Sequence, residues 1–144
     1  MRAEDPEMEA RVARHRRDRP SHWITVEEPL DIAGAVECHR DADCILVDCL
    51  TLWLSNLCWE YRADSSPIER IALEQLARVA FVPAAQVVLV TNEVGYGIVP
   101  ESPVARFFRD LQGRMNQEAA RIAGEVVQVV AGIPVVIKRP EVRP

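Results

Sequence analysis

The chain has 144 residues, of which 49% are hydrophobic and 27% charged, and its formal net charge is −5. This composition predicts one globular domain over residues 1–144, and the negative balance argues against a general nucleic-acid-binding protein. No run approaches the roughly 20 apolar residues of a membrane-spanning helix, and no secretory leader is recognisable. We therefore expect a cytoplasmic location, with the four cysteines as free thiols.

The first third of the sequence predicts two helices and one short strand. Asp5-Pro6-Glu7 has the residue types of a helix start, and apolar residues at helical spacing extend this helix from Pro6 to about Arg17. The stretch HWITVEEP, residues 22–29, predicts a short strand. A second helix is expected from Leu30 to His39.

Two later apolar runs, Cys44–Leu50 and Val87–Val90, predict buried strands. Their hydrophobicity is continuous rather than alternating, which is typical of parallel strands covered by helices on both faces. Amphipathic helices are expected between the two runs and again from Ser102-Pro103, with Gly124 as a glycine cap at the end. Two short strands, VVQVV and PVVIK, follow. The alternation of strands and helices predicts an α/β fold with a mostly parallel sheet.

Both apolar runs lead into polar residues, the first into Asp48 and the second into Asn92 and Glu93. Open α/β sheets bind ligands beyond the carboxyl ends of parallel strands, so these residues are candidates for a binding site. An acid in this place is also the pattern of the magnesium-holding acid of phosphate-loop NTPases, although many α/β proteins place a structural capping Asp there. Gly95 and Gly97 come next, and we expect them to free the loop from the usual backbone limits. Asn92, Glu93, Gly95 and Gly97 are all candidates for substrate or loop contacts.

A cluster of positive charge lies near the N-terminus, where residues 11–19 read RVARHRRDR. The plain interpretation is a solvated helix face. Guanidinium groups, however, bind phosphate oxygens in bidentate geometry, and their charge favours a neutral, nucleophilic imidazole at His15. The residues alone leave two interpretations of His15 open, a half-buried helix residue and a nucleophile for phosphorus.

Four stretches occur in an order and spacing that resemble a known family: EMEARVARHRRDRPSHWITVEEP, LVDCLTLWLSNL, VLVTNEVGYGIVPESPVARFFRDLQGRMNQEAA and VAGIPVVIK. The family is that of the bifunctional adenosylcobinamide kinase/adenosylcobinamide-phosphate guanylyltransferases of cobalamin biosynthesis. The resemblance implies a phosphate-loop NTPase-like fold and phosphorylation of adenosylcobinamide by GTP or ATP. It also implies transfer of GMP from GTP to adenosylcobinamide phosphate through a guanylylated histidine. Mg²⁺ as a cofactor and a homo-oligomer are further implications.

Carried over to this sequence, the resemblance implies His15 as the guanylylated residue. It also implies six nucleotide-binding residues, which are Arg16, Arg17, Asp18, Arg19, Glu27 and Asp48. Asp48 is in addition the candidate for holding Mg²⁺.

One departure from the family concerns the phosphate loop. Members of the family begin with a strand and a glycine-rich loop ending in Gly-Lys-Ser, whereas this sequence starts beyond that segment and contains one lysine, Lys138. We therefore expect an N-terminally truncated domain that lacks the first strands and the phosphate loop and has no kinase activity of its own. Three interpretations stay open: a fragment of the bifunctional enzyme, a shortened enzyme that keeps guanylyl transfer, and a non-catalytic homologue that binds nucleotide or pairs with a full-length subunit.

Overall fold

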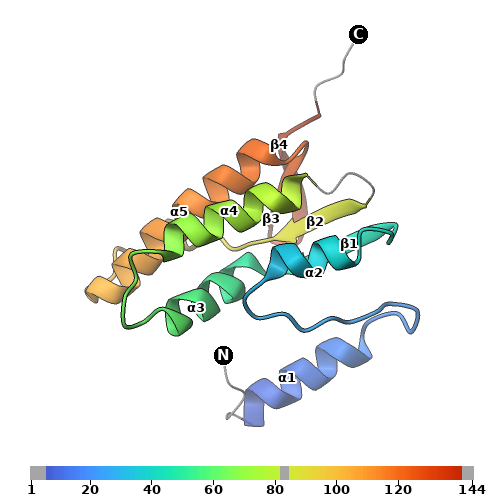
Figure 1. The fold of residues 1–144 in the computed structure, drawn as a ribbon, viewed down its shortest axis with the longest axis horizontal. Helices are drawn as coiled ribbons and strands as arrows, with labels where there is room; N and C mark the ends of the chain where they lie inside the picture. Colours follow the sequence, from blue (N-terminus) through green and yellow to red (C-terminus); the bar gives the residue numbers. More distant parts are fainter. Residues whose placement is uncertain (1–5, 82–84, 141–144) are drawn as a thin grey trace.

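A computed structural model describes residues 6–81 and 85–140, except for the side chains of residues 6–9, Arg11 and His15. Within these ranges the chain alternates helices with short strands (Figure 1). The helices are α1 (Pro6–Arg17), α2 (Ile32–Cys38), α3 (Leu50–Glu60), α4 (Ile68–Ala80) and α5 (Pro103–Ile122), together with the short 3₁₀ helix η1 (Val94–Tyr96). The strands are β1 (Cys44–Asp48), β2 (Gln86–Val90), β3 (Val126–Val130) and β4 (Ile133–Lys138). The α/β class predicted from the sequence is confirmed.

The described strands form two separate two-stranded sheets. β1 and β2 pair in parallel, with Asp48 beside Val90 at their carboxyl ends, whereas β3 and β4 form an antiparallel hairpin. The parallel pair positions the site, because the carboxyl ends of both strands lie at one edge. The sequence predicted a mostly parallel sheet. Among the described strands, two pair in parallel and two pair antiparallel, so parallel pairing does not predominate.

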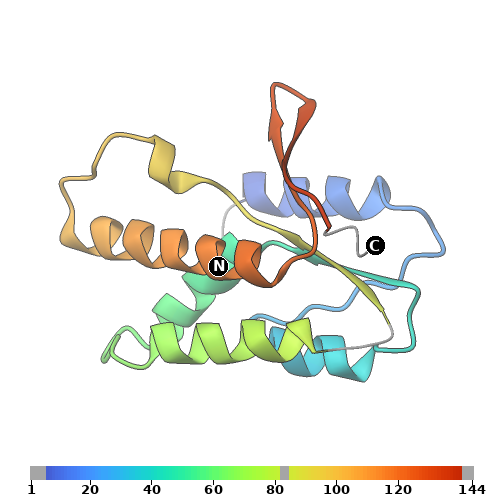
Figure 2. The same cartoon turned by 90° about the horizontal axis from the view of Figure 1, so that it is seen from above.

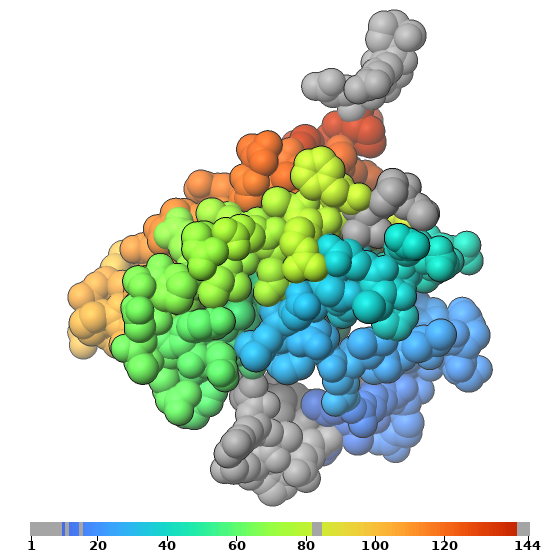
Figure 3. Space-filling view, viewed as in Figure 1, coloured from blue at the N-terminus to red at the C-terminus, as the bar shows by residue number. Residues whose placement is uncertain are grey.

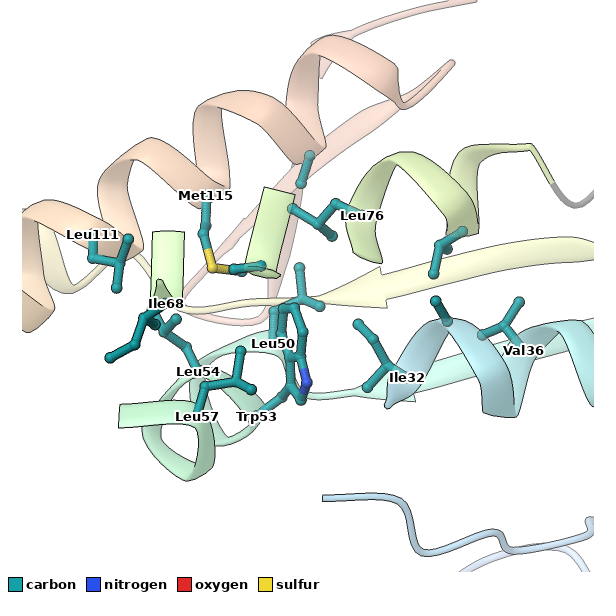
Figure 4. Close-up of a cluster of buried hydrophobic side chains, with 14 residues drawn as sticks. Ile32, Val36, Leu50, Trp53, Leu54, Leu57, Ile68, Leu76, Leu111 and Met115 are labelled. Carbon is teal, nitrogen blue, oxygen red and sulfur yellow. The ribbon is translucent and has the colours of Figure 1, made fainter. Parts of the chain in front are cut away.

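The core lies between the parallel pair and helices α2–α5 (Figure 4). In α4, apolar side chains recur every three or four residues and form one buried stripe, of which Ile68 and Leu76 are fully buried. Burial of such a side chain contributes about 1.5–3 kcal/mol relative to exposure. The outer surfaces of α2, α3 and α4 join into one continuous face of the molecule (Figure 3).

The parallel pair is covered by the core on one face, and the prediction of helices packed on both faces is wrong for the described residues. Side chains such as Ile45 and Leu89 pack against the core. The alternate side chains, Leu46, Val88 and Val90, are between 37% and 43% exposed. Figure 2 shows α1 on the side of the pair away from α2 and α4. Because its side chains are exposed, the second face is open to solvent. The segment that comes after α1 lies beside this face.

Residues 22–29 form no strand, contrary to the sequence prediction. They run as an extended loop that pairs with none of the described strands. A β-prone stretch needs a neighbouring strand to supply hydrogen bonds, and none is placed beside it. The chain is anchored just beyond this loop, because the indole N–H of Trp53 and the amide of Gln75 both donate to the carbonyl of Leu30 at 2.8 Å.

The C-terminal end of α5 also differs from the prediction. Ala123 caps the helix in an extended conformation with ψ of 139°, and Gly124 lacks the left-handed backbone of a glycine cap. The positive φ angles among the described residues belong to Ala131 and Gly132, in the turn of the β3–β4 hairpin.

All four cysteines are free thiols in the structure, as the sequence predicts. Cys38 and Cys44 are exposed, whereas Cys49 and Cys58 are partly buried. Burial raises the pKa of the Cys58 thiol, because the thiolate would lose hydration.

Candidate functional site

Two of the predicted nucleotide-binding residues meet Asp48 in one pocket. The pocket has a volume of about 260 Å³ and lies between the loop after α1 and the exposed face of the parallel pair. Its lining residues are Asp18, Arg19, Pro20, Trp23, Leu46 and Asp48. The carboxyl end of β1 supplies an acid, the loop supplies an acid and a cation, and Trp23 and Leu46 supply apolar surface.

The place of Asp48 in this pocket is explained by the geometry of the strand. Successive side chains of a strand point to opposite faces, and Ile45 and Val47 pack against the core. Leu46 and Asp48 therefore fall on the open face, where both line the pocket. Among the described residues, the Asp48 carboxylate has no hydrogen-bond or ion-pair partner. It is available to a ligand.

Two other predicted nucleotide-binding residues, Arg16 and Glu27, contact each other and do not line the pocket. Arg16 forms an ion pair with Glu27, and both side chains are more than half exposed. Such exposed pairs contribute only about 0–1 kcal/mol, so a ligand can displace this one at little cost. Arg19 donates from Nη1 to Oγ1 of Thr25 at 3.0 Å. These contacts hold the loop after α1 against the end of that helix, whereas Arg17 is exposed and lies outside the pocket lining.

His15 belongs to the last turn of α1, three residues before Asp18, and its side chain lies outside the described part of the chain. The helical backbone continues through this turn, with the N–H of Asp18 donating to the carbonyl of Arg14 at 3.0 Å. The position of the backbone near the pocket is consistent with a role for His15, and that role stays a prediction.

At the carboxyl end of β2, polar side chains form a closed network around the amide of Asn116. Its Oδ1 accepts from the Thr91 hydroxyl at 2.7 Å and from Nε2 of Gln112 at 2.9 Å. Its Nδ2 donates to the carbonyl of Asn92 at 3.1 Å and to Oε1 of Glu93 at 2.9 Å. Nε2 of Gln112 also donates to the Thr91 hydroxyl at 2.9 Å. Asn116 of α5 thus holds Asn92 and Glu93, and Gln112 holds Thr91 and Asn116.

One hydrogen bond links the ends of the two strands. The N–H of Asn92 donates to Oγ1 of Thr51 at 3.1 Å, and Thr51 lies in the first turn of α3, three residues after Asp48. The two ends therefore share one edge of the sheet. Asn92 and Glu93 are nevertheless not part of the pocket lining.

The loop after β2 does not need the backbone freedom that was expected of its glycines. Gly95 lies within η1, Gly97 has φ of −80°, and neither has the positive φ that favours glycine. An added Cβ would meet nothing within 4 Å at Gly95, and at Gly97 only the carbonyl of Val94 at 3.8 Å. Arg109 holds the loop, because its Nη2 donates to the carbonyl of Gly95 at 2.6 Å. The expectation of special backbone geometry is wrong, and ligand contacts by these glycines remain a prediction.

Reasoning from the sequence missed four residues that organise this edge. They are Thr51, Arg109, Gln112 and Asn116. A signal existed for two of them, since Gln112 and Asn116 are four residues apart and each comes directly after a residue of the apolar stripe of α5. A polar side chain beside the core side of a helix requires a hydrogen-bond partner, which the polar end of β2 supplies.

The fold is of the α/β class, and a pocket with acidic and cationic residues lies at the carboxyl end of β1, the place where open α/β sheets bind ligands. Comparison with known proteins gives the family. The family model described as cobinamide kinase / cobinamide phosphate guanyltransferase matches residues 1–137. The chain belongs to this family, which confirms the resemblance seen in the sequence.

Curated relatives agree with the family model. The bifunctional adenosylcobalamin biosynthesis protein CobU of Escherichia coli (strain K12) is 44% identical over 147 residues, which cover 93% of this chain and 80% of the relative. The protein of the same name from Salmonella typhimurium is 43% identical with the same coverage. The bifunctional adenosylcobalamin biosynthesis protein CobP of Pseudomonas aeruginosa is 41% identical over 137 residues, 94% of this chain and 78% of the relative. None of the helices in residues 6–81 and 85–140 has the length and hydrophobicity to cross a membrane.

Proposed function

We propose that this protein transfers GMP from GTP to adenosylcobinamide phosphate through a guanylylated His15. The observation that carries the proposal is the pocket in which Asp18 and Arg19 meet Asp48. These two residues come three and four positions after His15, so the end of α1 and the end of β1 contribute to one site. Membership of a cobinamide kinase / cobinamide phosphate guanyltransferase family supports this reaction class.

The chemistry of the pocket suits a purine nucleotide. Arg19 uses one N–H group on Thr25, and a guanidinium has five, so further donors remain for phosphate oxygens. Trp23 is 48% exposed and offers an indole face on which a purine can stack. Arg16 and Arg17 add positive charge in the same segment. In this proposal Arg16 exchanges its contact with Glu27 for phosphate, which frees the Glu27 carboxylate to accept hydrogen bonds from the nucleoside.

The two carboxylates of the pocket, Asp18 and Asp48, suit Mg²⁺ held together with a nucleotide. The described residues contain no group of three His, Cys, Asp or Glu side chains able to hold a metal by themselves. Mg²⁺ commonly takes one or two carboxylates and completes its shell with water and phosphate oxygens. Asp48 would hold the ion, which when bound neutralises charge on the phosphates.

The proposed reaction has two balanced steps. A ring nitrogen of neutral His15 attacks the α-phosphorus of GTP, a P–N bond forms, and the P–O bond to pyrophosphate breaks. A phosphate oxygen of adenosylcobinamide phosphate then attacks the same phosphorus, and the P–N bond breaks. GMP is thereby transferred and His15 restored. Arg16, Arg17 and Arg19 stabilise the negative charge that develops as pyrophosphate leaves.

The test is to incubate the purified protein with GTP labelled at the α-phosphate and to map the label. We expect a phosphoramidate at His15, labile in acid and stable in base. His15→Ala should take no label. His39→Ala is the matched control, because His39 lies at the end of α2 with Nδ1 at 2.8 Å from the carbonyl oxygen of Ala35 and outside the pocket.

Two results would contradict the proposal in different ways. Equal labelling of His15→Ala and the parent would show that another residue is the nucleophile. A parent that binds GTP but takes no label would exclude guanylyl transfer and would favour a non-catalytic nucleotide-binding protein.

A further inference from the structure

The amide of Asn116 uses its full hydrogen-bonding capacity at the end of β2. Two acceptor contacts join it to Thr91 and Gln112, and two donor contacts join it to the Asn92 carbonyl and to Oε1 of Glu93. Asn116 is 9% exposed, so little water competes for these bonds. Its orientation is therefore fixed, and it fixes in turn one oxygen of the Glu93 carboxylate.

Stability alone is a poor explanation for this network. Gln112 is fully buried, and its Oε1 has no hydrogen-bond partner among the described residues. A partly satisfied polar network in the core is less stable than well-packed apolar side chains. Leucine side chains would pack α5 against the strands without this loss. The network is explained if it serves to position the side chain at its outer end.

Glu93 is that outer end and the charged member of the network. Its side chain is exposed, and its Oε2 has no hydrogen bond to a described residue. The adjoining loop presents apolar and aromatic surface, since Tyr96 is 79% and Ile98 97% exposed. A fixed carboxylate next to such a loop suits a large ligand that combines apolar surface with N–H or O–H donors.

We propose that Asn116 is a positioning residue that holds Glu93 so that its second oxygen accepts a hydrogen bond from the acceptor substrate, adenosylcobinamide phosphate. The inference rests on the proposed function. The nucleotide is not the ligand of Glu93, because Glu93 does not line the pocket in which the nucleotide is proposed to bind. A reaction with two substrates needs a second binding region near the first. The hydrogen bond from Asn92 to Thr51 places Glu93 at the same edge of the sheet as Asp48.

The experiment uses the intact protein and three variants. Asn116→Ala removes the amide that holds Glu93, and Glu93→Gln keeps an acceptor for Asn116 but removes the charge. Gln117→Ala is the matched control, because Gln117 is the neighbouring amide on α5 and is exposed. Calorimetry without GTP gives the Kd of adenosylcobinamide phosphate, and a separate assay measures labelling by α-labelled GTP.

We expect Asn116→Ala and Glu93→Gln each to weaken binding of adenosylcobinamide phosphate about tenfold, as loss of a hydrogen bond to a charged group does. Labelling by GTP should stay within about twofold of the parent, because the pocket is unchanged. The double variant should bind about as weakly as the weaker single variant, since both changes remove the same contact. Gln117→Ala should match the parent in both assays.

Parent-like binding by a folded Asn116→Ala and by Glu93→Gln would overturn the proposal. The proposal would also be overturned if Asn116→Ala lowered GTP labelling, acceptor binding and the melting temperature together. That result would indicate a structural role for Asn116. If Asn116→Ala fails to fold, the exposed Glu93→Gln decides. Failure of the proposed function is distinguishable, because it shows as absence of label in the parent, whereas acceptor binding and its dependence on Glu93 are measured without GTP.

Discussion

The carboxyl ends of β1 and β2 lie at the same edge of the sheet, yet their polar side chains are organised in different ways. At the end of β1, Asp48 lines an open pocket and its carboxylate has no partner among the described residues. At the end of β2, Thr91, Asn92 and Glu93 are held by amides of α5. One end presents a free carboxylate to a ligand, and the other presents a carboxylate whose position is already fixed.

The difference comes from the connection that leaves each strand. After β1 the chain enters α3 within two residues, so there is no room for a polar loop to fold back on Asp48. After β2 the chain passes through η1 and returns along α5, which carries Gln112 and Asn116 back to the strand end. The length of the connection thus decides whether a strand-end residue is left open or is built into a network.

At the end of β1, Asp48→Asn should lower activity and leave stability nearly unchanged. Loss of the carboxylate removes a charged contact to Mg²⁺ or nucleotide, worth about 1.5–3 kcal/mol, so guanylyl transfer should fall about tenfold to a hundredfold. The free energy of unfolding should change by less than about 0.5 kcal/mol, because the side chain is exposed and unpartnered in the described structure. Steady-state kinetics and urea denaturation measure the two quantities.

Asp43→Asn is the control for this change, since Asp43 is exposed and precedes the opposite end of the same strand. It should leave both quantities unchanged. A large loss of stability in Asp48→Asn with unchanged turnover would mean that Asp48 is a structural cap.

Thr91→Val should have the opposite profile, with its main effect on stability. The valine keeps the branched shape of the strand residue but leaves Asn116 and Gln112 each without one buried partner. We expect the free energy of unfolding to fall by about 1–3 kcal/mol in urea denaturation. Thr25→Val, which removes a hydroxyl that contacts the exposed loop residue Arg19, should cost less than about 0.5 kcal/mol. Equal losses in the two variants would show that the network at β2 is no stronger than a surface contact.

The elements of the fold could be predicted from the sequence because their signals are local. The stripe of α4 and the apolar run of β1 each lie within a dozen or so residues, and both elements form where the pattern indicates. The apolar runs did not reveal what covers them, so the prediction that both strand faces are packed was wrong. The expected strand at 22–29 failed for the same reason, because its partner strand is not a local property.

The site could be predicted only in part. The position of Asp48 at a strand end could be inferred from the sequence pattern, whereas its meeting with Asp18 and Arg19 depended on the family resemblance. The hydrogen bonds of Thr91 to Gln112 and Asn116 span 21 and 25 residues. Which buried amide contacts which strand end depends on how α5 packs, and spacing along the chain does not determine this.

Trp23→Ala tests whether the pocket at the carboxyl end of β1 binds a nucleotide. Removal of the indole should raise the Kd of GTP about two- to tenfold, because stacking of aromatic rings contributes about 0.5–1.5 kcal/mol beyond simple burial. Trp23→Phe should retain most of the affinity. Trp59→Ala is the control, since Trp59 is 68% exposed and lies outside the pocket, with Arg62 over its ring. Unchanged GTP binding in Trp23→Ala, measured by calorimetry, would remove Trp23 from the site.

Cys49→Ser should produce the smallest effect, and it concerns the turn that leaves Asp48 open. Cys49 is the N-cap of α3, where its Sγ accepts weakly from the N–H of Leu52 at 3.5 Å. A serine hydroxyl is a better N-cap acceptor, so the free energy of unfolding should rise by about 0.5 kcal/mol. Cys38→Ser, at an exposed position in the last turn of α2, should leave stability unchanged. Guanylyl transfer should be unaltered in Cys49→Ser, because the cap fixes the helix start without touching the pocket. A lower melting temperature with normal activity would mean that packing of the partly buried sulfur outweighs the cap. A lower activity would mean that the position of Asp48 depends on the turn after β1, although the Asp48 side chain itself has no partner in the described structure.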